Sequence, residues 1–120
     1  MSAIRLTIEG EPVPKARPRV VRATGRVYTP TSDVENAIAL VMRNSGYAGR
    51  FKQRTRIAVS MFFYGASKQA DIDNLGKLYL DALVKSGIVS DDRYVDAIWL
   101  ERREGGKPRV EIVVGEWTPE

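Results

Sequence analysis

Residues 71–77 read Asp-Ile-Asp-Asn-Leu-Gly-Lys and join the strongest predicted strand of the chain to its second predicted helix. The strand covers residues 55–64, which are rich in β-branched and aromatic side chains. The helix runs from about residue 74 to residue 86 and ends at Gly87, because glycine favours the left-handed turn that closes a helix. Its apolar residues recur at spacings of three and four, which predicts one core-facing stripe: Leu75, Leu78, Tyr79, Ala82 and Leu83.

The N-terminal half predicts a strand, a small hairpin and a helix. Residues 3–9 alternate apolar and polar side chains, and residues 19–28 can fold back on themselves at Thr24-Gly25. The first helix opens near Ser32, which Thr31 or Ser32 itself can cap, and Glu35 stands where a capping box places its acidic residue. The predicted apolar stripe of this helix consists of Val34, Ile38, Val41 and Met42.

The C-terminal part predicts two further strands, at residues 94–103 and 109–114. The residues between them, Gly-Gly-Lys-Pro at 105–108, predict a hairpin turn. The order of elements predicts an α+β fold. We expect a single domain over residues 1–120, with a mixed β-sheet of about four to five strands and two helices packed on one face.

The composition excludes several kinds of chemistry. The 120-residue chain contains no Cys and no His, so disulfides, thiol catalysis and zinc sites built on these residues are excluded. No apolar run is long enough to cross a membrane, and together with the lack of cysteine this predicts a cytoplasmic protein. The net charge of +4 hides an asymmetry, because residues 1–56 carry +7 and residues 57–120 carry −3.

Four carboxylates gather around the second predicted helix. Asp71 and Asp73 are two residues apart and should project to the same side of an extended segment. Lys77 lies on the polar face of the helix, and the pair Asp91-Asp92 follows after the helix ends. Carboxylates suit hard cations such as Mg2+, with Mn2+ as a substitute, and such ions assist phosphodiester hydrolysis. The alternative is that these residues serve only as helix caps and turn residues.

The basic residues concentrate near the N-terminus. A proline-bounded loop and the predicted hairpin carry most of them, and one more lysine precedes the acidic motif: Lys15, Arg17, Arg19, Arg22 and Arg26, with Lys68. Arginine can bind phosphate oxygens through two parallel hydrogen bonds. These residues therefore predict contacts with the phosphates of a nucleic acid, beside an acidic part that holds a metal ion.

Three segments of the chain form a recognisable set: Gly-x-Pro-x-Pro-Lys-x-Arg-Pro-Arg at residues 10–19, Tyr-Thr-Pro at residues 28–30, and Asp-x-Asp-Asn-Leu-x-Lys at residues 71–77. Together they resemble the RusA family of Holliday junction resolvases. The third is the most specific of the three, and the resemblance extends over nearly the whole chain.

The resemblance implies a homodimeric, Mg2+-dependent endodeoxyribonuclease that binds four-way DNA and cuts two strands symmetrically in recombination and repair. It implies that Asp71, Asp73 and Asp92 are the metal-binding catalytic carboxylates, and that Lys77 assists beside them. Two alternatives remain: a nuclease for another branched DNA, and a non-catalytic branched-DNA-binding dimer. The residues alone leave open whether Asp91 shares the role of Asp92.

Overall fold

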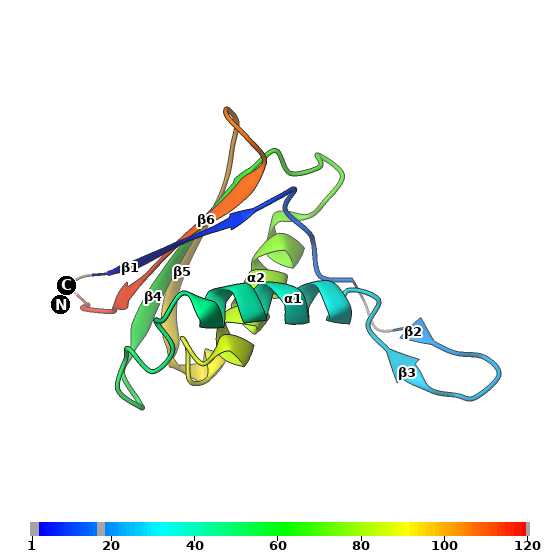
Figure 1. Ribbon diagram of the computed structural model, residues 1–120, viewed down its shortest axis with the longest axis horizontal. Helices are drawn as coiled ribbons and strands as arrows, with labels where there is room; N and C mark the ends of the chain where they lie inside the picture. The colour runs from blue at the N-terminus through cyan, green and yellow to red at the C-terminus, as the bar shows by residue number, and fades with distance from the viewer. Residues whose placement is uncertain (1–2, 17–18, 120) are drawn as a thin grey trace.

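A four-stranded mixed sheet forms one layer of the protein (Figure 1). The computed structural model describes residues 3–16 and 19–119. In spatial order the strands are β1 (Ile4–Glu9), β6 (Arg109–Glu116), β4 (Ile57–Tyr64) and β5 (Val95–Arg103). Strand β6 runs antiparallel to both of its neighbours, whereas β4 and β5 run parallel.

Two helices, α1 (Ser32–Asn44) and α2 (Ile72–Ser86), form a second layer on one face of this sheet (Figure 1). This arrangement confirms the predicted α+β fold. The predicted apolar stripe of α2 is also confirmed, because all five of its residues are at most 1% exposed. Alternate residues of β4 meet the helices, as the period of a strand requires, and all four are buried: Ile57, Val59, Met61 and Phe63.

The connection between β5 and β6 differs from the prediction. The two strands run in opposite directions, but they do not form a hairpin, because β4 lies between them. The chain at residues 104–108 therefore crosses over the end of β4, where Gly65 follows the strand. Turn residues indicate that a chain reverses; they carry no information on whether a third strand occupies the space between the two arms.

Helix α1 is rotated relative to the predicted stripe. Its buried residues are Glu35, Ile38, Ala39 and Met42, whereas Val34 and Val41 are 40% and 55% exposed. The predicted capping box is wrong as well, since Thr31 makes no side-chain capping bond and Glu35 turns inward between the helices. In this orientation Glu35 meets two lysines, which supply the compensating charge that a buried carboxylate requires.

A small two-stranded hairpin, β2 (Arg19–Val20) and β3 (Val27–Tyr28), extends away from the two layers (Figure 1). Its turn is held by backbone hydrogen bonds from Thr24 and Gly25 to the carbonyl of Val21, which confirms the predicted turn. No helix within residues 3–16 and 19–119 has the length and apolar character needed to cross a membrane.

Gly65 gives a test of the crossover. Its φ of +76° is in the left-handed region, and a Cβ there would meet the ring of Pro108 at 3.1 Å. Gly65→Ala should lower the free energy of unfolding in urea by more than the roughly 1–2 kcal/mol that left-handed strain alone costs. Gly46→Ala is the matched control, because Gly46 has φ +87° and open space around it. Equal losses in the two variants would contradict the close approach of residues 104–108 to the end of β4.

Candidate functional site

Asp71 and Asp73 stand at the start of α2 with exposed carboxylates. Asp71 occupies the N-cap position in extended backbone, yet its side chain makes no capping hydrogen bond. One carboxylate oxygen of Asp73 accepts a hydrogen bond from the backbone N–H of Asn74 at 3.0 Å. The positive end of the helix dipole favours negative charge here. The carboxylate of Asp71 is thus available to a ligand rather than used to close the helix.

The loop before Asp71 is held by a residue that the sequence did not single out. The guanidinium of Arg102, on β5, donates hydrogen bonds to the carbonyls of Ser67, at 3.0 Å, and of Ala70. Because these carbonyls flank the last residues of the loop, Arg102 fixes the backbone that delivers Asp71 to the helix. No sequence signal marks this role, since β5 and the loop are about 30 residues apart and meet only through the parallel pairing of β4 and β5.

Lys77 and Asp81 lie one turn apart on the outward face of α2. The Lys77 ammonium is 3.5 Å from a carboxylate oxygen of Asp81. Asp73 lies a further turn toward the N-terminus, as the spacing of four residues predicts. A second lysine, Lys15, approaches Asp81 from the loop after β1, at 3.1 Å. The outward face of α2 therefore presents alternating acidic and basic groups along its length.

Asp91 and Asp92 lie beyond the other end of α2. Asp91 caps a short 3-10 helix, η1 (Asp92–Tyr94), by accepting a hydrogen bond from the backbone N–H of Arg93 at 3.1 Å. This bond is the main cause that lowers the pKa of the Asp91 carboxyl. Asp92 is exposed and does not cap η1. Of the two, Asp92 is the carboxylate that remains available to a ligand.

A cavity of about 430 Å3 opens between α1, α2 and η1 beside this second group. Asp91 and Asp92 line it together with four other charged residues, Lys15, Glu35, Asp81 and Lys85. Neither Asp71 nor Asp73 reaches it.

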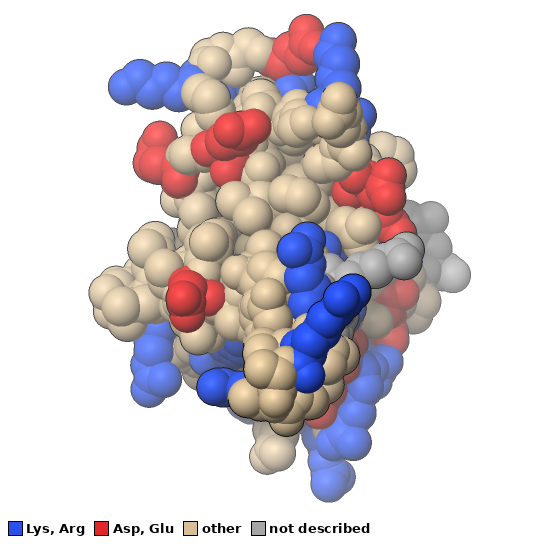
Figure 2. Space-filling model, turned by 90° about the vertical axis from the view of Figure 1, so that its right-hand side faces the viewer, with Lys and Arg blue, Asp and Glu red and all other residues tan. Residues whose placement is uncertain are grey.

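The structure thus brings Asp71 together with Asp73 at the start of α2, whereas Asp92 lines a cavity beside the later part of the helix, with Asp81, Val84 and Lys85. The helix has 15 residues, which corresponds to roughly 20 Å. Within the described residues, no three acidic side chains lie close enough together to hold a metal ion. On the face shown in Figure 2, the acidic side chains form separate patches.

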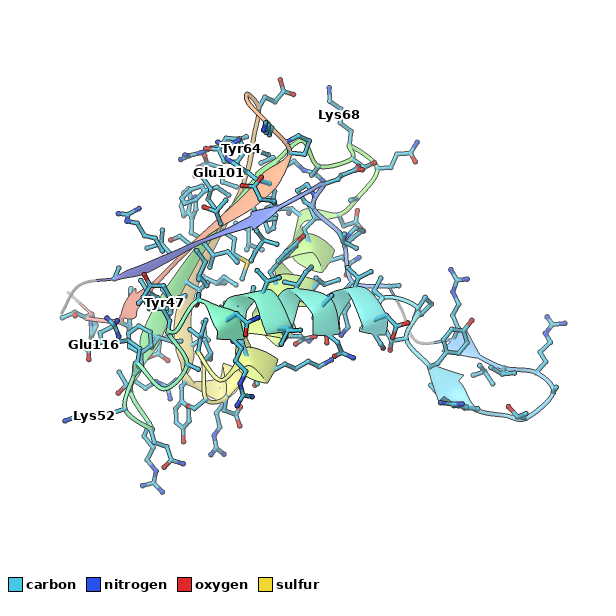
Figure 3. All side chains as sticks on the ribbon, viewed as in Figure 1. Tyr47, Lys52, Tyr64, Lys68, Glu101 and Glu116 are labelled. Atoms are coloured by element: carbon cyan, nitrogen blue, oxygen red, sulfur yellow. The ribbon has the colours of Figure 1, made fainter. Side chains whose placement is uncertain are left out.

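The predicted DNA-binding residues fall in three places. Arg19, Arg22 and Arg26 are exposed on the projecting hairpin. Lys68 is exposed on the loop before Asp71 and points outward, on a different side of the molecule from the hairpin (Figure 3). Lys15 is only 23% exposed, because two carboxylates hold its ammonium group. Arg17 lies outside the described residues.

A family comparison identifies the chain. The family model described as Endodeoxyribonuclease RusA matches residues 9–115, which include both acidic groups and the projecting hairpin. The chain belongs to the RusA family. RusA proteins are endodeoxyribonucleases that resolve Holliday junctions in recombination and repair, and they are generally metal-dependent. A search of curated proteins finds no match to this chain.

The sequence pattern predicted the wrong structural role for Glu35 in this RusA domain. Glu35 fits a capping box, but in the fold it lines the cavity that also holds Asp92. A signal for burial was present, since Glu35 precedes the buried Ile38 and Met42 by three and seven residues and so shares their face of the helix.

The difference between Asp71 and Asp91 can be tested by stability. Asp71→Ala should leave the melting temperature of this RusA domain close to that of the wild type, because the side chain makes no capping bond. Asp91→Ala should lower the melting temperature, because η1 loses its cap. Thermal unfolding followed by circular dichroism measures both. A clear loss of stability in Asp71→Ala would mean that this carboxylate serves the helix and not a ligand.

Proposed function

We propose that this RusA domain resolves Holliday junctions as a homodimer that uses Mg2+ held by Asp71, Asp73 and Asp92. The observation that carries the proposal is the pair of exposed carboxylates at the start of α2, of which Asp71 makes no capping bond. With neither His nor Cys in the chain, the available donors are oxygen atoms, which suit Mg2+ and Mn2+. A bound ion of this kind would lower the pKa of water and offset negative charge on the phosphate under attack.

The separation of Asp92 from the other two carboxylates supports the homodimer. Ligands of one ion must have their oxygens within about 5 Å of each other, since each lies at 2.0–2.6 Å from the metal. One chain does not meet this condition, because α2 intervenes. A two-fold axis can place opposite ends of two copies of one element side by side. We therefore assign Asp92 of the second chain to the site formed by Asp71 and Asp73 of the first.

The basic groups would act before and during the reaction. Arg19, Arg22 and Arg26 on the projecting hairpin would hold phosphates of a junction arm, and Lys68 would hold the strand that enters beside Asp71. Lys77 lies one turn from Asp73 on the same face of α2, where its ammonium would offset charge that develops on the scissile phosphate. A two-fold dimer repeats each contact, which matches the symmetry of a four-way junction and yields paired cuts.

The first experiment measures cleavage of a synthetic four-way junction. Wild-type protein with Mg2+ should introduce paired nicks, and EDTA should abolish them. Asp73→Asn should lose cleavage and keep junction binding, because the amide removes a charged metal ligand without changing the shape of the side chain. A linear duplex of the same sequence is the substrate control. Junction binding without nicks at any tested Mg2+ or Mn2+ concentration would contradict a hydrolytic site, and equal cleavage of flaps or forks would indicate another branched substrate.

A second experiment tests whether two chains share each site. A heterodimer of Asp73→Asn and Asp92→Asn, purified through two different tags, should regain about half of the wild-type nicking rate, because one of its two shared sites carries neither change. Each variant alone should be inactive. Asp71→Asn paired with Asp73→Asn is the matched control, since both changes lie at the same end of α2 and leave each site with one lost carboxylate. If the first heterodimer is as inactive as the control, the sites are not shared in this way.

A further inference from the structure

A buried carboxylate stands at the centre of an ion-pair network that connects the interior to the outward face of α2. Glu35, on α1, is 1% exposed, and it is the charged residue that is buried within the described part of the chain. Lys15 donates a hydrogen bond to one of its carboxylate oxygens, and Lys85, on α2, forms an ion pair with the other. Each oxygen of Glu35 is thus matched by one lysine from a different element.

Lys15 uses its charge within the protein. Besides Glu35, its ammonium binds Asp81 at 3.1 Å. Burial alone would lower the pKa of Lys15, but its hydrogen bonds to Glu35 and Asp81 outweigh burial and raise the pKa above the ordinary value. Its backbone N–H also donates to the carbonyl of Asn74, beside Asp73, at 2.9 Å. Two carboxylates of the protein thus already neutralise this ammonium, which weakens its attraction for a DNA phosphate.

Asp81 passes the network on to the surface. Its two carboxylate oxygens face different lysines, Lys15 at 3.1 Å and Lys77 at 3.5 Å. An exposed lysine with a single partner one turn away is weakly ordered, because such pairs contribute little and lysine has four rotatable bonds. Here the partner of Lys77 is Asp81, which also pairs with Lys15, and Lys15 in turn pairs with the buried Glu35. Through Asp81 and Lys15, Lys77 is therefore connected to the buried carboxylate of Glu35.

We propose that Glu35 and Lys15 are positioning residues for Lys77, acting through Asp81, and that Lys15 makes no contact with DNA phosphate. The inference rests on the proposed function, in which Lys77 acts on the scissile phosphate. It changes the expected role of Lys15, which its place in a basic, proline-bounded loop assigned to DNA. The loop after β1 is then a brace between the two helices, and DNA contact belongs to the hairpin beyond it.

Salt dependence distinguishes the two roles of Lys15. Junction affinity is measured in EDTA between about 50 and 200 mM salt, where each phosphate contact contributes about 0.9 to the slope of log affinity against log salt concentration. Arg22→Met, on the exposed hairpin, should reduce the slope by about one. Lys15→Met should leave the slope as in the wild type. An equal reduction in both variants would show that Lys15 binds phosphate and would overturn the proposal.

The cleavage rate at saturating protein, in a single turnover with Mg2+, tests the positioning role. Lys15→Met and Asp81→Asn should each lower this rate by about ten-fold, as is typical for residues that orient an active group. The two changes combined should lower it no further, because both break the same connection. Lys107→Met, an exposed lysine on the loop that crosses over β4, is the control for loss of a positive charge and should cleave at the wild-type rate.

A double variant separates positioning from simple stability. Lys15→Met leaves Glu35 with one lysine, and Glu35→Gln in the same chain removes the excess buried charge, so the melting temperature should rise from that of Lys15→Met. Cleavage should remain slow, because Asp81 still lacks Lys15. Recovery of the wild-type rate would overturn the positioning role. If the wild type itself does not cleave, the proposed function fails, and the salt slopes still decide whether Lys15 contacts phosphate.

Discussion

The packing of α2 against the sheet is the contact on which the other features depend. The five residues of its apolar stripe are buried in the core, and Gly76 lets the helix approach β5 so closely that a Cβ there would lie 2.6 Å from Leu100. Because the apolar face of α2 is packed against the sheet, the opposite face of the helix must point to solvent. Asp73, Lys77 and Asp81 point outward because Leu75, Leu78 and Leu83 point inward, so the core and the candidate chemistry are two sides of one helix.

Elements with a strong local period could be predicted from the sequence. The inward face of α2 follows from spacings of three and four, and the predicted face is buried. The strand at β4 was predicted from its β-branched and aromatic residues, and its alternate residues are buried. The hairpin at residues 19–28 follows from its turn residues. The predictions that were wrong concern features that depend on residues far apart in the sequence. The β5–β6 connection looks like a hairpin from its Gly-Gly-Lys-Pro turn, but β4, some 30 residues earlier, occupies the space between the strands. The observed face of α1 likewise buries Glu35, whose partners Lys15 and Lys85 come from two other elements.

The candidate site divides in the same way. The pairing of Asp71 with Asp73 is a local property, and the structure keeps them at one helix end. The location of Asp92 is not local, because it depends on how the chain returns after Gly87, and one chain leaves it at the opposite end of α2. From the sequence, Lys15 is predicted to bind phosphate because it lies in a basic loop. Its two carboxylate partners come from α1 and α2, which no spacing within the loop reveals.

The strand order also has a consequence for how the chain folds during its synthesis on the ribosome. Strand β1 pairs with β6, whose residues are among the last of the described chain to be made, and β6 alone joins β1 to β4. Until β6 emerges, the two halves of the sheet have no backbone connection, and contacts between residues so far apart in sequence form slowly. A nascent chain therefore has β4 and β5, the strands on which α2 packs, before β1 can join the sheet. The last strand to be made completes the layer and attaches β1, and with it the start of the loop that carries Lys15, to the rest of the sheet.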